Sequence, residues 1–324
     1  MSNNFLKRSK VFWNNKKIKK YKKKIFTLNF LLIVLIGVAL FLSGILANKL
    51  FILQEEKNLE NQKITEQRNI ESTFKKIQDQ VIKEKYVFKI RWGDLGKKMV
   101  EDGVIDKVKL AQAISGGDKL PKDLDKYFSE SQDKIELTQA NSQFWVDVLW
   151  GLGLANKNRI LEEGDMMRDG DASNFASTGG WTLGPENPMS VYSKYSYITL
   201  SESQQKLVEE IASNIYRPCC GNSTAFPDCN HGMAMLGLIE LMVSQDFSKD
   251  EIYKTALAFN TYWFPQTYLE AGLFLEKIGQ DYSKISPKEL LSAKFSSAMR
   301  DEAISKAAQD VQWETLRGGG SCGA

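Results

Sequence analysis

The sequence predicts a mainly α-helical protein, with one N-terminal transmembrane helix, a helical stalk and an α-helical extracytoplasmic domain that contains a long irregular loop. Three observations lead to this fold class. Residues 25–47 are apolar and carry no charge, and residues 54–85 contain no Gly or Pro. Further along the chain, apolar residues recur mostly at helical spacing, and only residues 86–90 and 195–198 have the character of strands.

The apolar stretch at residues 25–47 is long enough to cross about 30 Å of hydrocarbon as a helix. Seven lysines lie between residues 16 and 24, directly before it, and such a cluster stays on the cytoplasmic side of a membrane. A cleavable signal peptide is the alternative, but the stretch is longer than a typical signal core and no clear cleavage site follows. We therefore predict a signal anchor in the cell membrane, with residues 1–24 as a basic cytoplasmic tail and the C-terminal domain extracytoplasmic.

The charge is distributed very unevenly along the chain. Residues 1–24 contain ten Lys or Arg and no acidic residue, whereas the remainder carries 33 basic and 40 acidic side chains. An acidic domain does not suit a nucleic-acid backbone, so no nucleic-acid partner is expected. The membrane is the one partner that the sequence predicts directly, and it names no protein partner.

Residues 48–85 are predicted to form a helical stalk, because they are rich in Glu, Lys and Gln. Ile70, Phe74, Ile77 and Val81 follow the spacing of a coiled-coil seam. The seam covers only about two heptads, fewer than the three or four that define a coiled coil. Two interpretations remain, a short coiled coil that forms a homo-oligomer and a solvated helical spacer.

The folded domain is predicted to occupy residues 86–317. Gly103 is expected to end a first short helix, and Asp106 to cap the next one from Lys107. Residues 144–154 are aromatic and apolar, which is typical of a core helix. Residues 155–199 contain many Gly, Pro, Asp and Asn, so they predict a long loop, of which residues 175–184 are expected to fold over the cysteine segment and shape a pocket.

The second half of the domain contains the clearest helix signals. Ser201 and Gln204 form a capping box for a helix over residues 201–216. Asp228 is expected to cap a helix over about residues 229–244 that is apolar on nearly all its sides.

The C-terminal part is expected to contain three further helical stretches. Ser248 or Asp250 is predicted to cap a helix that Pro265 interrupts before it continues to residue 278. A last helix is expected to open at residues 286–287 and to extend to about residue 313, and residues 318–324 form a flexible Gly-rich tail.

The candidate site lies at residues 216–235, which hold three of the four cysteines and the only histidine of the chain. Thiolates and imidazole are ligands that transition metals prefer, so a site for zinc, copper or iron is one interpretation. The C-C-x8-C-x-H spacing matches no standard zinc or haem motif. The predicted ligands are Cys219, Cys220, Cys229, His231 and Cys322.

Other chemistries fit the same residues. The cysteines can carry out thiol–disulfide exchange, or they can form structural disulfides in a non-catalytic interaction module tethered to the membrane. A nucleophile activated by His231 is disfavoured, because residues two positions apart at a helix start point away from each other. Whether the protein is an enzyme is therefore left open. Met233 and Met235 are either thioether ligands or ordinary core methionines.

Cys322 follows three glycines at the end of the chain. A flexible Gly-rich tether has a high effective concentration near any site within its reach. Cys322 is therefore either a mobile ligand or resolving thiol for the other three cysteines, or an unrelated cysteine in a frayed tail.

The motif over residues 216–235, together with residues 92–96 and 260–268, resembles a family of uncharacterised, membrane-anchored bacterial proteins. The shared pattern is Y-R-P-C-C-x-N-S-T-x-F-P-D-C-N-H-G-M-A-M, and the resemblance covers most of residues 87–275. It implies a membrane anchor, and it implies nothing about an activity.

Overall fold

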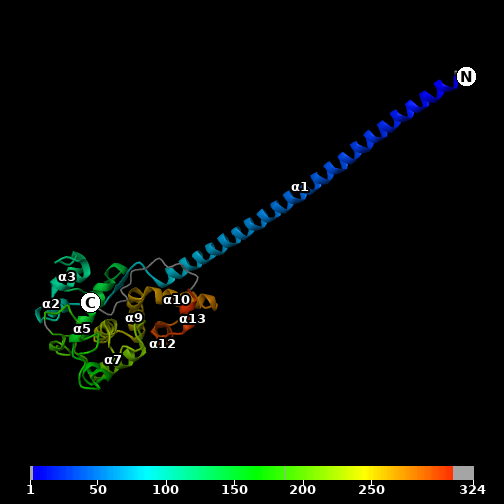
Figure 1. Cartoon of the computed structure of the whole chain (residues 1–324). Helices are drawn as coiled ribbons and strands as arrows, with labels where there is room; N and C mark the ends of the chain where they lie inside the picture. Colours follow the sequence, from blue (N-terminus) through cyan, green and yellow to red (C-terminus); the bar gives the residue numbers. More distant parts are fainter. Residues whose placement is uncertain (1–2, 186, 309–324) are drawn as a thin grey trace. The chain divides into compact units, whose positions relative to one another are not determined.

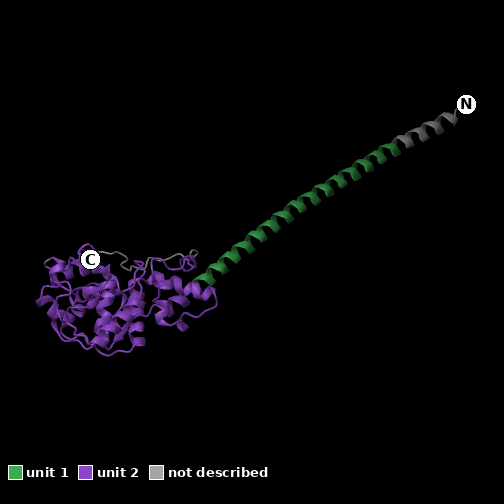
Figure 2. Ribbon diagram, turned by 90° about the horizontal axis from the view of Figure 1, so that it is seen from below, with its two compact units in different colours: residues 1–71 green, residues 72–324 purple. Residues whose placement is uncertain are grey.

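The structure is a computed structural model that describes residues 3–185 and 187–308. It is mainly helical, as predicted (Figure 1). The chain divides into two units, residues 1–71 and residues 72–324 (Figure 2). The described α-helices are α1 Asn3–Val81, α2 Leu95–Glu101, α3 Lys107–Ser115, α4 Lys122–Ser129, α5 Ser142–Ala155, α6 Arg159–Glu163, α7 Glu202–Asn214, α8 Asn230–Val243, α9 Lys249–Trp263, α10 Pro265–Lys277, α11 Pro287–Leu290, α12 Ala293–Ser296 and α13 Glu302–Lys306.

Helix α1 contains the apolar stretch, and among the described residues it is the one helix long and apolar enough to cross a membrane. The apolar side chains of residues 25–47 have no protein covering: Phe26 is 74% exposed and Phe41 is 70% exposed. So large an apolar surface is favourable only in contact with lipid or with another protein.

The end of α1 belongs to the compact unit, which begins at Ser72 rather than near residue 86. Ile77 and Val81 are buried, and both pack against Gly272 of α10. A Cβ on Gly272 would lie 2.4 Å from Ile77 Cγ2 and 3.3 Å from Val81 Cγ2, so this position leaves no room for a side chain. The C-terminal half of the expected coiled-coil seam is therefore used inside the same chain. Of the four seam residues only Ile70 precedes this unit, and a homo-oligomer formed through a coiled coil stays a prediction.

The core of residues 72–308 is built around α8, whose side chains are all buried. Helices α5, α7 and α9 pack against it. Glycines allow the backbones of α5 and α8 to approach closely, because a Cβ on Gly153 would lie 2.1 Å from Met233 O. Glu240 of α8 is fully buried and accepts hydrogen bonds from the side-chain amides of Asn156 and Asn158. These bonds attach the chain after α5 to the core helix.

Most of the predicted helix boundaries are confirmed. Asp106 caps α3, Ser201 forms the capping box with Gln204 at α7, and Ser248 caps α9. Pro265 occupies the start of α10, directly after the break at Phe264. Local capping interactions decide these boundaries, so they can be recognised in the sequence.

Two predicted segments are wrong, the last helix, whose residues 309–313 lie outside the described residues, and the strand at residues 195–198, where Tyr195 forms only an isolated bridge with Asn156. The expected last helix is broken into α11, α12 and α13 within residues 287–306, because its middle turns aside to hydrogen-bond residues 216 and 220. The sequence also missed strand β2, Ile135–Leu137, which pairs antiparallel with β1, Tyr86–Phe88. A strand this short has no recognisable alternation.

Candidate metal centre

The three cysteines of residues 216–235 lie on a short loop and on the helix start that follows it. After α7 ends, Tyr216 and Ser223 form an antiparallel bridge, and Thr224 N donates to Ile215 O at 2.8 Å. This bridge closes the loop that carries Cys219 and Cys220. Cys229 lies at the N-cap of α8.

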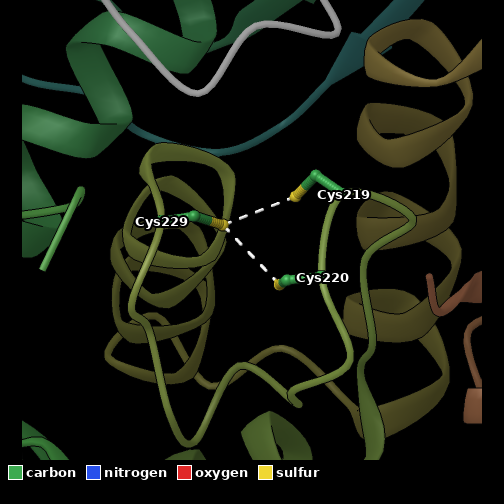
Figure 3. A group of neighbouring side chains, drawn as sticks. All are labelled: Cys219, Cys220 and Cys229. Carbon is green, nitrogen blue, oxygen red and sulfur yellow. Dashed lines mark hydrogen bonds between the residues drawn. The ribbon is translucent and has the colours of Figure 1, made fainter. Parts of the chain in front are cut away.

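The loop brings the sulfur atoms together (Figure 3). Cys229 Sγ lies 3.4 Å from Cys219 Sγ and 3.9 Å from Cys220 Sγ, and all three lie within 4.8 Å of one another. These distances are well above the roughly 2.05 Å of a disulfide bond. Among the described residues the three cysteines are therefore free thiols. Cys229 is 5% exposed, and the other two are half-buried.

Arg217 is the residue that organises the loop. Its side chain is 1% exposed, and its Nε donates to Cys229 Sγ at 3.2 Å. Its terminal nitrogens donate to Asn222 O at 3.0 Å, to Phe226 O at 2.9 Å and to the Asp228 carboxylate. One guanidinium therefore connects both ends of the cysteine loop, which its planar set of donors makes possible.

Gly232 makes room for this guanidinium on the first turn of α8. A Cβ at Gly232 would lie 2.6 Å from both Cζ and Nε of Arg217, closer than atoms can approach. The Gly232 N–H also donates to Cys229 Sγ at 3.4 Å. The cysteine, not the preceding aspartate, is thus the cap of the helix.

The predicted capping role of Asp228 is wrong. Its carboxylate accepts hydrogen bonds from Arg217 and from Asn222 Nδ2, the latter at 2.8 Å. Because these donors occupy the carboxylate, Cys229 caps α8 in its place. The sequence could not reveal this exchange, since Asp is among the preferred N-cap residues.

The surroundings of Cys229 favour its thiolate. Hydrogen bonds from the thiols of Cys219 and Cys220 lower the pKa of Cys229 well below its usual value, and Arg217 lowers it further. Hydrogen bonding to Cys220 and Cys229, with burial, raises the pKa of Cys219. The interaction with Cys219 lowers the pKa of Cys220, but Cys229 and burial raise it, to about 11. Of the three cysteines, Cys229 is therefore the one whose thiolate the surroundings favour most.

His231 does not join the sulfur cluster in this structure. It is 1% exposed, and its ring lies 4.5 Å from the ring of Phe264 and 5.6 Å from that of Trp263. Neither ring nitrogen has a hydrogen-bond partner among the described residues. Burial lowers the pKa of His231 to about 4. The histidine is thus a neutral aromatic in the core, which gives no support to its activating Cys229.

Residues 175–184, in the loop before α7, contact the cysteine segment, as the sequence predicted. Ser177 N donates to Asp228 O at 3.0 Å, and the rings of Phe175 and Phe226 meet edge to face at 5.4 Å. Trp150 Nε1 in turn donates to Ser177 O at 2.7 Å. These contacts tie the segment to helix α5, and the expected pocket remains a prediction.

Polar contacts from residues 260–268 and from Ser296 hold the start of the cysteine loop. Asn260 Nδ2 donates to Tyr216 O at 3.0 Å, and it also reaches the hydroxyl of Tyr268 at 3.2 Å. Ser296 Oγ donates to the same Tyr216 carbonyl at 3.2 Å. The start of the cysteine loop is thereby held by α9, α10 and α12.

Sequence reasoning missed Arg217, Gly232 and Asn260. The available signal for Arg217 was a single basic residue two positions before Cys219, and Gly232 and Asn260 stood out only as parts of the motif over residues 216–235 and of residues 260–268. Met233 and Met235 are 0% and 1% exposed within α8, so they pack as core residues. Cys322 lies outside the described residues.

Comparisons with protein-family models, with curated proteins and with solved structures give no match. The resemblance stated from the motif therefore stays a prediction, and only the geometry of the centre supports a function.

Proposed function

We propose that this protein is a membrane-anchored protein whose extracytoplasmic domain binds one transition-metal ion at Cys219, Cys220 and Cys229. The spacing of the sulfur atoms carries the proposal. Four-coordinate zinc has metal–sulfur bonds of roughly 2.3 Å, which places its sulfurs about 3.8 Å apart. Cys229 Sγ lies 3.4 and 3.9 Å from the other two sulfurs, on either side of that value, and all three sulfurs lie within 4.8 Å of one another.

The charges around the sulfurs also suit a cation. With three thiolates, a divalent ion leaves one negative charge and a monovalent ion leaves two, and Arg217 lies 3.2 Å from Cys229 Sγ as a counter-ion. Asp228 partly offsets that guanidinium. Buried charges need such pairing, because an isolated one costs several kcal/mol.

Thiol–disulfide exchange has less support from the same geometry. The attacking group in exchange is an accessible thiolate. Here the thiolate-favouring cysteine, Cys229, is 5% exposed, whereas burial and hydrogen bonding raise the pKa of the more accessible Cys219 and Cys220. Structural disulfides are also less suited, because three clustered cysteines can form one disulfide and leave a thiol over.

The metal site is tested by metal analysis and thiol counting on the full chain in detergent micelles. We expect about one ion per chain by elemental mass spectrometry, which reports zinc, copper and iron alike. The peptides with Cys219, Cys220 and Cys229 should resist alkylation until a chelator is added. A chain without stoichiometric metal, whose cysteines react equally with and without chelator, would contradict the proposal.

The membrane topology follows from the exposed apolar face of α1 and from the lysines that precede it. A positive cluster is retained on the cytoplasmic side, which directs residues 48–324 outward. The part of α1 before residue 72 remains available for a homo-oligomer.

An alkaline phosphatase fused to the C-terminus of the full chain tests this topology. The fusion should be active, because that enzyme matures only outside the cytoplasm, and a fusion after residue 24 should be inactive. The reverse pattern would refute the orientation.

A further inference from the structure

Met299 lies directly beside the cysteine loop, although it is far from it in sequence. It follows α12, and the backbone of the preceding residue is bound to the loop, because Ala298 N donates to Cys220 O at 3.0 Å. Met299 is nevertheless 79% exposed. An apolar side chain so exposed contributes little to the core.

The thioether of Met299 rests over Gly221, the residue after Cys220. A Cβ at Gly221 would lie 2.8 Å from Met299 Cε and 3.7 Å from its Sδ. The end of the Met299 side chain therefore occupies the space that a side chain at residue 221 would enter.

A four-coordinate ion held by three cysteines needs one more donor, and among the described residues the nearby His231 and Asp228 are engaged in other contacts. His231 packs against Phe264 and Trp263. Asp228 is bound by Arg217 and Asn222.

We propose that Met299 supplies the fourth donor, so that the site selects a soft monovalent ion, Cu(I), over Zn(II). Thioether sulfur binds Cu(I) well and Zn(II) poorly. Three rotatable bonds let an exposed methionine turn toward the thiolates without disturbing the core. This inference rests on the proposed function and names the metal that the same site takes.

Met299→Leu tests the inference, because leucine keeps the volume and removes only the sulfur. Full-length protein in detergent is titrated anaerobically with Cu(I) against a chromophoric chelator, and in parallel with Zn(II). We expect Cu(I) affinity to fall at least about tenfold, since that is the scale even for residues around a metal's direct ligands. Zn(II) affinity should stay unchanged, and X-ray absorption should count one sulfur fewer around copper.

Met189→Leu is the matched control, since it removes a thioether from another part of the same domain and should leave both affinities unchanged. Equal Cu(I) affinity and sulfur count in Met299→Leu and wild type would overturn the role of Met299 while the three-cysteine site stands. A wild-type chain that binds neither ion would instead overturn the proposed function, and this inference with it.

Discussion

Cys229→Ser is expected to lower metal affinity about a hundredfold, the largest effect of any single substitution at the centre. Structural zinc binding of about 10–16 kcal/mol shared among four ligands gives roughly 3 kcal/mol for each, which is about a hundredfold. The loss of affinity is expected to be largest at Cys229, because this residue lies within hydrogen-bond reach of both other sulfurs. Its thiolate is also the one favoured by Arg217 and by the Gly232 N–H.

The measurement is a chelator competition on full-length wild type and on serine variants of each cysteine. Cys219→Ser and Cys220→Ser should also weaken binding, but less than Cys229→Ser, because Cys229 is the sulfur that accepts a hydrogen bond from Arg217. Cys322→Ser belongs in the same series, and a loss there would bring the tail into the site. A metal affinity of Cys229→Ser equal to that of the wild type would contradict the proposed metal centre.

Arg217→Met is expected to destabilise the domain by about 3 kcal/mol, the lower end of what breaking a buried ion pair costs. The substitution removes the hydrogen bonds that the guanidinium donates to the Asp228 carboxylate, to Cys229 and to two loop carbonyls. The lower end applies because the Asp228 side chain is 22% exposed and regains some water. Lysine cannot restore the wild-type state, since it lacks the planar fork of donors.

Urea unfolding of the full chain in micelles, followed by tryptophan fluorescence with a chelator present, measures this loss without any contribution from metal. Arg159→Met is the matched control. Its guanidinium pairs with Glu202 and Glu209 at the surface, where solvent screens the interaction, so its unfolding midpoint should move much less. Equal midpoints for Arg217→Met and wild type would show that the guanidinium does not organise the loop.

The features that the sequence predicted correctly depend on neighbouring residues. The apolar stretch in α1 needs only a window of composition, and the caps at Asp106, Ser201 and Ser248 need only the next few residues. The clustering of cysteines was also visible, because three of the four lie within residues 216–235 of the sequence. Such short-range interactions survive in any tertiary context.

The tertiary structure decided which of those residues meet. It buried His231 against Phe264 and Trp263, and it made Cys229 the cap of α8 because Arg217 occupies Asp228. It also brought Met299 to the loop by breaking the expected last helix.

By itself, the sequence determined a helical chain with an apolar segment and a cysteine-rich loop, since periodicity and capping are local properties. Only the tertiary structure decided that three sulfurs converge beside a buried Arg217, with Gly232 leaving space for it. The physical reason is that a buried guanidinium must satisfy all its donors, and the chain arranges distant carbonyls, a carboxylate and a thiolate around it to do so.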